Sequence, residues 1–350
     1  FIGLLESFTL KKLVFMTNKN MKKNIFKKLF IKISKILGYE IIDQSEFISP
    51  TLEKKLNDDL SIINNKSIVL PLGEVQITRK TKSVLIILRI NTEIEIWDQN
   101  KKRLFELPKI EYTLRSLNSL IKSINFSKKK YPNIKYKTII IDDNSKKENI
   151  SKIHGLITNS NISIDIIKLN HNENKNTIKE QRSEQTFSNL SSLLKCYEIA
   201  KDQSDDLVFF VEDDYLHFEP MMEEMIASYE RISSQLKKEL FMCPTDYPYL
   251  YMNNKKTNIL IGNKRHWRIV DRTLCTFMTS KIMINKYWSN FYNTCLDRND
   301  PFEKYLNEIY QKEFCISPLK SLSVHMTNIN SSYGLSPFID YKKIWDENSI

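Results

Sequence analysis

The segment 206–220, with the sequence DLVFFVEDDYLHFEP, constrains the fold of this chain more than any other. Its apolar run LVFFV is followed at once by three carboxylates, Glu212, Asp213 and Asp214. Such a run predicts a strand buried on both faces, as in a parallel sheet, and acids at its carboxyl end lie where open α/β sheets bind ligands. Because three adjacent acids repel one another, a bound cation would explain the cluster; a solvated acidic turn is the alternative.

The same strand signal recurs along the chain and alternates with helical periodicity. Strands are expected at 84–88, 138–141, 162–169 and 207–211, and helices are expected around 114–124, 187–197 and 222–232. This alternation predicts an α/β fold with a mostly parallel, Rossmann-like sheet flanked by helices. Past residue 240 the pattern loosens into mixed aromatic, basic and acidic residues, which suit an acceptor-binding region or an irregular surface.

The composition is that of a globular protein, with 41% hydrophobic residues in a chain of 350. The net charge of +11 is weak evidence for an anionic partner, because Lys, Asn and Ile are abundant throughout, as in AT-rich coding bias. The five cysteines are scattered and odd in number, so they indicate neither a disulfide framework nor a zinc site and suit a reducing cytoplasm. No apolar run approaches the roughly 18 residues of a membrane span.

Residues 21–42 carry the one cluster of basic charge and predict an amphipathic helix that ends at Gly38. Its apolar face is expected to hold Phe26, Phe30, Ile33 and Leu37, with Lys27, Lys28, Lys32 and Lys35 opposite. Such a helix can lie in an anionic membrane surface, or pack on its own domain. We expect an N-terminal extension over 1–80 with a hairpin near 69–73, a main domain over 81–330 and a tail over 331–350.

A second buried strand also ends in acids, in the sequence IIIDDNS, which places Asp142 and Asp143 at a strand end. Neither a GxGxxG motif nor a Walker A loop occurs, which excludes the dinucleotide and P-loop interpretations. A nucleotide bound beside these acids therefore needs a metal ion to hold its phosphates. Near the C-terminus, residues 321–327 alternate so that His325 lies on the face opposite Val324, which favours a ligand role for its imidazole.

IIIDDNS and EDD together resemble the GT-A glycosyltransferases, specifically family 2, over about residues 82–330. The resemblance implies that Asp143, with Asp142 beside it, contacts the nucleoside base. EDD resembles the family's DxD motif, which makes Asp214 the metal-binding acid and places Glu212 and Asp213 near ribose or metal. A late histidine completes the metal shell in several GT-A enzymes and corresponds to His325, so the implied metal ligands are Asp214, Glu212 and His325.

Parts of the family pattern are missing. After the first strand the chain reads LRINTEIEIW instead of a Pro-x-Tyr-Asn-like segment, which leaves Arg89 and Asn91 as the nearest polar candidates. The family's late catalytic acid has its nearest counterpart in Glu303, followed by Asp271 and Asp300 as candidate bases. Asp300, Pro301 and Glu303 also have the spacing of a helix capping box.

The resemblance implies an inverting, metal-dependent glycosyltransferase that uses Mn²⁺ or Mg²⁺ and a nucleotide-sugar donor, most simply a UDP- or GDP-sugar. Arg182 is a candidate diphosphate contact or a solvated surface residue. The expected acceptor is a glycan or lipid-linked glycan of a bacterial surface polysaccharide or lipopolysaccharide, with the enzyme peripheral at the cytoplasmic membrane face and without nucleic acid. The alternatives are a nucleotidyltransferase, which usually has a Gly-rich basic loop that LRINTEIEIW lacks, and a non-catalytic basic module that binds membrane or nucleic acid.

Overall fold

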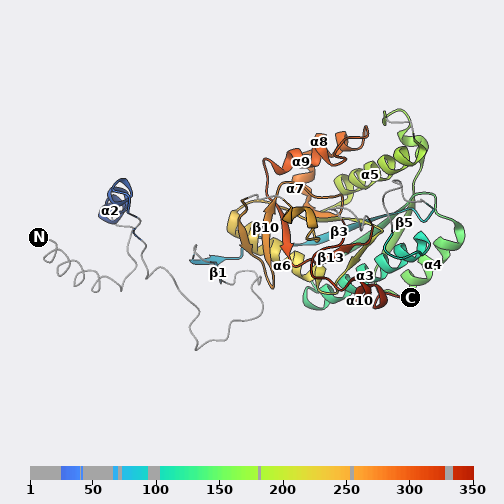
Figure 1. The fold of residues 1–350 in the computed structure, drawn as a ribbon, viewed down its shortest axis with the longest axis horizontal. Coiled ribbons are helices and arrows are strands. Elements are labelled where there is room, and N and C mark those ends of the chain that lie inside the picture. Colours follow the sequence, from blue (N-terminus) through green and yellow to red (C-terminus); the bar gives the residue numbers. More distant parts are fainter. Residues whose placement is uncertain are drawn as a thin grey trace, which may run out of the picture. The chain divides into compact units, whose positions relative to one another are not determined.

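The computed structural model describes residues 25–39, 41, 66–69, 73–93, 103–179, 183–252, 256–327 and 334–350 (Figure 1). The chain divides into two compact units. The smaller unit comprises residues 1–58 and 66–75, and the larger unit comprises residues 59–65 and 76–350.

The described part of the smaller unit holds a helix and a strand pair. Helix α2 spans Ile25–Ile36, inside the predicted range 21–42. Gly38 has φ +84°, its N–H bonds Lys35 O at 3.1 Å, and the next N–H bonds Ser34 O at 2.8 Å. These are the two hydrogen bonds of a Schellman motif, so the predicted stop at Gly38 is confirmed. Strands β1 (Lys66–Val69) and β2 (Gly73–Gln76) pair with each other, which confirms the predicted hairpin.

The larger unit is built on a nine-stranded sheet with the order β5-β4-β3-β6-β11-β8-β12-β10-β9. Its first four strands, β3 (Ser83–Ile90), β4 (Lys135–Asp142), β5 (Ile164–Lys168) and β6 (Leu207–Glu212), are all parallel. They coincide with the four predicted strands. The predicted α/β class is therefore confirmed, with the parallel strands in one half of the sheet and helices on both sides.

The second half of the sheet was not predicted. It consists of β8 (Phe241–Met242), β9 (Ile259–Ile261), β10 (His266–Val270), β11 (Phe277–Ser280) and β12 (Cys315–Leu319). Strand β11 runs antiparallel to both β6 and β8, and only β8 and β12 are a parallel pair in this half. These strands have two to five residues, too few for a hydrophobic period to be recognised. They exclude the alternative of an irregular surface for this part of the chain.

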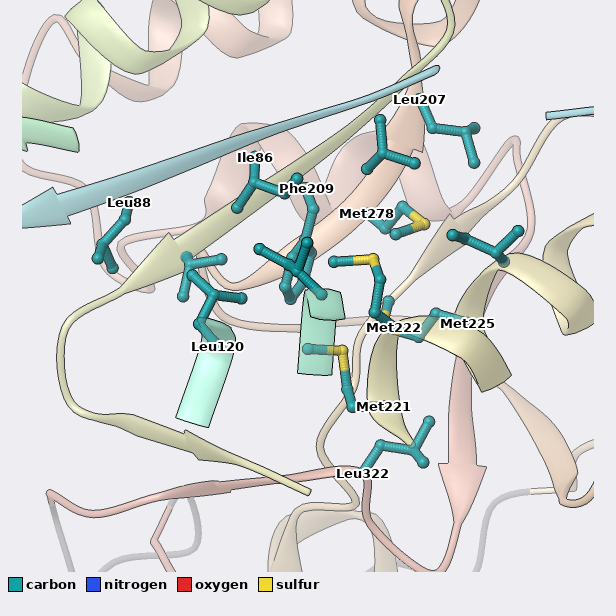
Figure 2. Close-up of a cluster of buried hydrophobic side chains, with 14 of the residues drawn as sticks. Ile86, Leu88, Leu120, Leu207, Phe209, Met221, Met222, Met225, Met278 and Leu322 are labelled. Carbon is teal, nitrogen blue, oxygen red and sulfur yellow. The ribbon is translucent and has the colours of Figure 1, made fainter. Parts of the chain in front are cut away.

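Helices cover both faces of the sheet (Figure 1). Helices α3 (Lys109–Lys130), α4 (Lys147–Thr158) and α6 (Met221–Leu236) pack on one face, and α5 (Glu184–Gln203), α7 (Lys281–Lys286), α8 (Trp288–Thr294) and α9 (Lys304–Tyr310) pack on the other. Strand β6 alternates between them: Phe209 joins the cluster with α3 and α6, whereas Phe210 joins the cluster with α5 and α8. Figure 2 shows Phe209 between Leu120 of α3 and Met222 of α6.

A small two-stranded sheet and the C-terminal helix complete the unit. Strand β7 (Tyr215–His217) pairs antiparallel with β13 (Ser323–His325). Helix α10 (Tyr341–Asp346) buries Trp345 against Tyr112 and Phe105, with ring centroids 4.7 and 4.5 Å apart. The described residues 334–350 thus pack as part of the larger unit. Short 3₁₀ turns, η2 (His171–Asn174) and η3 (Pro248–Tyr251), lie in the connections.

One predicted helix start needs correction. Helix α9 begins at Lys304, with Glu303 as its N-terminal flanking residue and no capping hydrogen bond from that side chain. Because Asp300 and Pro301 lie before the helix, the predicted capping box does not form.

Gly262 is a position where the fold leaves no room for a side chain. A Cβ there would lie 2.3 Å from Trp267 Nε1 and 2.5 Å from Ser228 Oγ, two atoms that hydrogen-bond each other at 3.0 Å in the core. We expect Gly262→Ala to lower the free energy of unfolding by about 1–3 kcal/mol, because the buried indole has to move. Urea denaturation measures this change.

Gly155→Ala is the matched control, since a Cβ at that exposed position in α4 meets nothing within 4 Å. It should raise the free energy of unfolding by about 0.5–1 kcal/mol through helix propensity. Equal effects of the two substitutions would show that Gly262 is not needed for space.

Candidate functional site

The two acidic strand ends meet at one edge of the sheet. Strand β3 lies between β4 and β6, with Ile90 opposite Asp142 and Arg89 opposite Glu212. The backbone N–H of Asp143 bonds Ile90 O at 2.9 Å, which extends the β3–β4 pairing by one residue. The parallel arrangement therefore brings the acids of IIIDDNS and EDD to the two sides of the same strand end.

Asp143 is nearly buried, and its carboxylate is held from two other elements. His171 Nε2, from η2, lies 2.7 Å from Oδ1, and the Ser188 hydroxyl of α5 donates to Oδ2. Asp142 accepts the Ser145 N–H at 3.2 Å, and burial raises the pKa of Asp142 above its usual value. A carboxylate has about four acceptor positions, so Asp143 can still accept a hydrogen bond from a ligand.

Glu212 is paired with Arg89. The Arg89 guanidinium donates to Glu212 Oε1 and to the Asn189 side chain, and the Thr276 hydroxyl donates to Glu212 Oε2 at 3.3 Å. Burial alone would lower the pKa of Arg89, but the Glu212 charge, the nearby Cys275 and Cys196 and the hydrogen bond to Glu212 together hold that pKa above its ordinary value. Glu212 is thus part of a partly buried ion pair at the strand end.

The Asp213 side chain points toward helix α3. Lys109 Nζ donates to Oδ1 at 2.6 Å and the Thr113 hydroxyl donates to Oδ2 at 2.7 Å, both from the first turns of α3. Asp213 is 8% exposed and Thr113 is fully buried. This ion pair connects the acidic turn, residues 212–214, to α3.

Asp214 contacts the β13 strand and the residues after it. His325 Nε2 lies 3.2 Å from Asp214 Oδ2, and the Thr327 hydroxyl donates to the same oxygen at 2.5 Å. Burial would raise the pKa of Asp214, but the charges of His325 and Lys109 and these hydrogen bonds hold it well below its usual range. The His325 ring also stacks on Tyr215 at 4.6 Å, so the imidazole is fixed in position.

The three expected metal ligands are not all together. Glu212 faces Arg89, while Asp214 and His325 form a separate pair, and no group of three His, Cys, Asp or Glu side chains that could hold a metal ion occurs among the described residues. Two ligands of one cation at about 2.1 Å are spaced by roughly 3 Å, which the Asp214–His325 pair matches. These two side chains fit a divalent cation whose other ligands are phosphate oxygens and water.

The candidate bases lie in three different settings. Asp300 is exposed, and Asp271 lies 3.6 Å from the Arg272 guanidinium. Burial raises the pKa of the Cys275 thiol, and the charges of Glu212 and Glu303 raise it further. Glu303 itself is partly buried at the N-terminal flank of α9. Asn91 offers its backbone N–H toward Asp213 at 3.4 Å, whereas Arg182 lies outside the described residues.

Several residues of the site were missed from the sequence. His171 follows β5, at the same edge of the sheet as Asp143, so the rule that located the acids could also have found it. Thr327 likewise is a polar residue that follows the end of a strand, β13. Lys109 and Ser188 come from helices, and no pattern marks them before the packing of α3 and α5 is known.

No known family model matches the chain, and no curated protein matches it. Among solved structures, it is similar to residues 1–349 of S. aureus TarS, with 12% identity over 59% of this chain and 49% of that chain and a TM-score of 0.33. It is also similar to the galactosyltransferase LgtC (10% identity, 65% of this chain and 70% of that chain, TM-score 0.35). It is similar as well to a UDP-glucose pyrophosphorylase, with 7% identity over 71% of this chain and 94% of that chain and a TM-score of 0.37. The chain thus spans about half of the TarS fragment, and TM-scores this low leave the function to be inferred from the site itself.

We expect Asp213→Ala to lower the free energy of unfolding by about 3 kcal/mol, because it leaves the Lys109 charge and the Thr113 hydroxyl buried without their acceptor. The double variant Asp213→Ala/Lys109→Met should recover more than half of that loss, since no unpaired charge remains. Urea denaturation of the three proteins measures both values. Additive losses in the double variant would contradict a structural pairing of Asp213 with Lys109.

Proposed function

We propose that this chain is a glycosyltransferase that moves a sugar from a nucleoside diphosphate to an acceptor hydroxyl. One observation carries the proposal: Asp143 and the Asp214–His325 pair follow two strands that flank β3, so a base-binding group and a cation-binding pair share one edge of a parallel sheet. A nucleoside diphosphate has a base at one end and charged phosphates at the other, and this arrangement suits both.

Asp143 is proposed to accept a hydrogen bond from the nucleoside base. His171 and Ser188 keep its carboxylate fixed and oriented, which suits a group that selects a ligand by a hydrogen bond. Uracil and guanine carry a ring N–H that such an acceptor can bind, and this favours UDP- or GDP-sugars as donors.

Asp214 and His325 are proposed to hold a divalent cation, Mn²⁺ or Mg²⁺, together with the phosphate oxygens of the donor. The cation supplies positive charge that stabilises the departing diphosphate. Asp214 suits this role because its pKa lies well below the usual range, so the carboxylate stays ionised. Thr327 orients the carboxylate, and the Tyr215 ring orients the imidazole.

Glu303 is proposed as the base, with Asp271 and Asp300 as the other candidates. The acceptor oxygen forms the new bond to the anomeric carbon, the bond from that carbon to the diphosphate breaks, and the acceptor proton passes to the carboxylate. One displacement of this kind inverts the anomeric carbon. Glu303 is partly buried whereas Asp300 is exposed, which supports the choice of Glu303.

The N-terminal helix supports a proposal about location. On α2, Leu29, Phe30 and Ile33 are exposed together with Lys32 and Lys35. A helix with these two classes of exposed side chain suits an anionic lipid surface. No helix among the described residues is long and apolar enough to cross a bilayer. We therefore propose a peripheral position at the inner membrane face, with a surface polysaccharide or lipid-linked glycan as the product.

Calorimetric titration of UDP and GDP with and without Mn²⁺ tests the nucleotide site. One of the two should bind in a Mn²⁺-dependent way, and Asp214→Asn should weaken that binding at least tenfold, because it removes the charge that holds the cation. Asp165→Asn, which changes an exposed acid of β5, is the matched control and should leave binding unchanged.

Absence of binding by UDP, GDP, CDP and dTDP in the presence of Mn²⁺ would contradict the proposal. Formation of UDP-glucose from UTP and glucose 1-phosphate would identify a nucleotidyltransferase instead.

Vesicle co-sedimentation tests the membrane proposal. The protein should pellet with vesicles containing 30% phosphatidylserine and stay in solution with pure phosphatidylcholine, because the lysines of α2 need anionic headgroups. Lys32→Glu/Lys35→Glu should reduce the pelleted fraction severalfold, and the matched charge change Lys312→Glu/Lys342→Glu, on exposed sites of the larger unit, should not. Equal partitioning to both kinds of vesicle would rule out electrostatic attachment.

A further inference from the structure

A cavity of about 380 Å³ lies beside β10, apart from the acidic strand ends. Its wall includes Tyr249 of η3, Arg268 of β10, Tyr310 of α9 and the segments 256–258 and 271–272. None of Asp143, Glu212, Asp214 and His325 lines it. Its volume falls within the roughly 300–1,000 Å³ of small-molecule sites, and it joins aromatic side chains with a few polar ones, as such sites do.

A stack of tyrosines connects this cavity to the acidic turn. Tyr215 stacks on His325 at 4.6 Å, its hydroxyl bonds the Tyr247 hydroxyl at 2.6 Å, and the Tyr247 ring stacks on Tyr249 at 5.6 Å. Tyr249 is therefore shared: one end of the stack contacts the proposed cation ligand and the other forms the cavity wall. The stack therefore links the cavity wall to His325 through continuous side-chain contacts.

The cavity wall has an excess of positive charge. Arg268 forms a buried ion pair with Asp246 and lies 4.3 Å from the centre of the Tyr251 ring, so its guanidinium is held rigidly. Arg272 lies 3.6 Å from Asp271. Lys256 is exposed, and no carboxylate among the described residues lies within ion-pair distance of it. Three cations thus face two carboxylates.

We propose that this cavity binds a saccharide that carries an anionic group, either a carboxylate or a phosphate. Tyr249 and Tyr310 give the lining its aromatic side chains, while Thr257 and Asn258 supply hydrogen-bonding groups, a combination that suits a sugar. Lys256 and Arg268 are the cations of the lining that would pair with the anionic group. Arginine suits both anions, since its planar fork pairs with carboxylate and phosphate oxygens.

This inference rests on the proposed function for its role: the saccharide is the acceptor, and the tyrosine stack places it beside the donor site. It narrows the acceptor from any glycan to an acidic one. The binding itself depends only on the cavity, so it can be measured without a nucleotide.

Saturation-transfer NMR with D-glucuronate, glucose 6-phosphate and D-glucose tests the inference. We expect D-glucuronate or glucose 6-phosphate to receive saturation from the protein, and D-glucose, the uncharged match, to receive at least threefold less. Lys256→Glu should reduce the signal of the anionic sugar at least fivefold. Lys342→Glu, the same charge reversal on an exposed lysine of α10, should leave it unchanged.

The two anionic sugars distinguish the sources of the charge: a stronger response of D-glucuronate indicates a uronic acid acceptor, and a stronger response of glucose 6-phosphate indicates a phosphorylated one. Equal signals from glucose and both anions, or signals unaffected by Lys256→Glu, would overturn the inference. If UDP or GDP binds but neither anionic sugar does, the inference fails and the proposed function stands. If the anionic sugars bind but no nucleotide does, the cavity stands as a binding site and the glycosyltransferase proposal fails.

Discussion

Burial of β6 on both faces is the constraint on which the larger unit depends. The strand pairs in parallel with β3 and antiparallel with β11, so it joins the two halves of the sheet. Its side chains alternate between the helix layer of α3 and α6 and the layer of α5 and α8. A charged side chain at 207–211 would be buried in one of the two helix layers at a large desolvation cost. The acids can therefore stand only at the end of the strand and after it.

The end of β6 then has to accommodate three acids, and the structure separates them by direction. Glu212 pairs with Arg89 of β3, Asp213 pairs with Lys109 of α3, and Asp214 faces His325 of β13. Each acid has its partner in a different element, so the three carboxylates point in different directions and need no shared ligand to relieve their repulsion. Two of these pairs fasten structural elements, and only the third combines a carboxylate oxygen with an imidazole nitrogen.

The sequence predicted the parallel half of the sheet and the positions of the acids, because long apolar runs are unambiguous and their ends lie where polar residues begin. Asp143 and Asp214 could be located in this way. The partners of the acids could not, since Lys109 and Thr113 occupy ordinary positions in a helix and acquire a role only when α3 packs against β6. The same lack of packing information explains why Glu212 was expected to bind the metal ion together with Asp214. The two acids are close in sequence, but the structure directs their side chains to different neighbours, Arg89 and His325.

The tyrosine stack gives the two candidate sites a common physical element. His325 cannot shift without disturbing Tyr215, and the hydroxyl contact passes that displacement to Tyr247 and then to Tyr249 in the cavity wall. Burial keeps the pKa values of Tyr215 and Tyr247 well above their ordinary value, so the hydroxyl pair stays neutral and its hydrogen bond persists across physiological pH. A cation bound at Asp214 and His325 would therefore fix one wall of the neighbouring cavity. The stack is thus a continuous packed connection between the proposed cation ligands and the cavity wall.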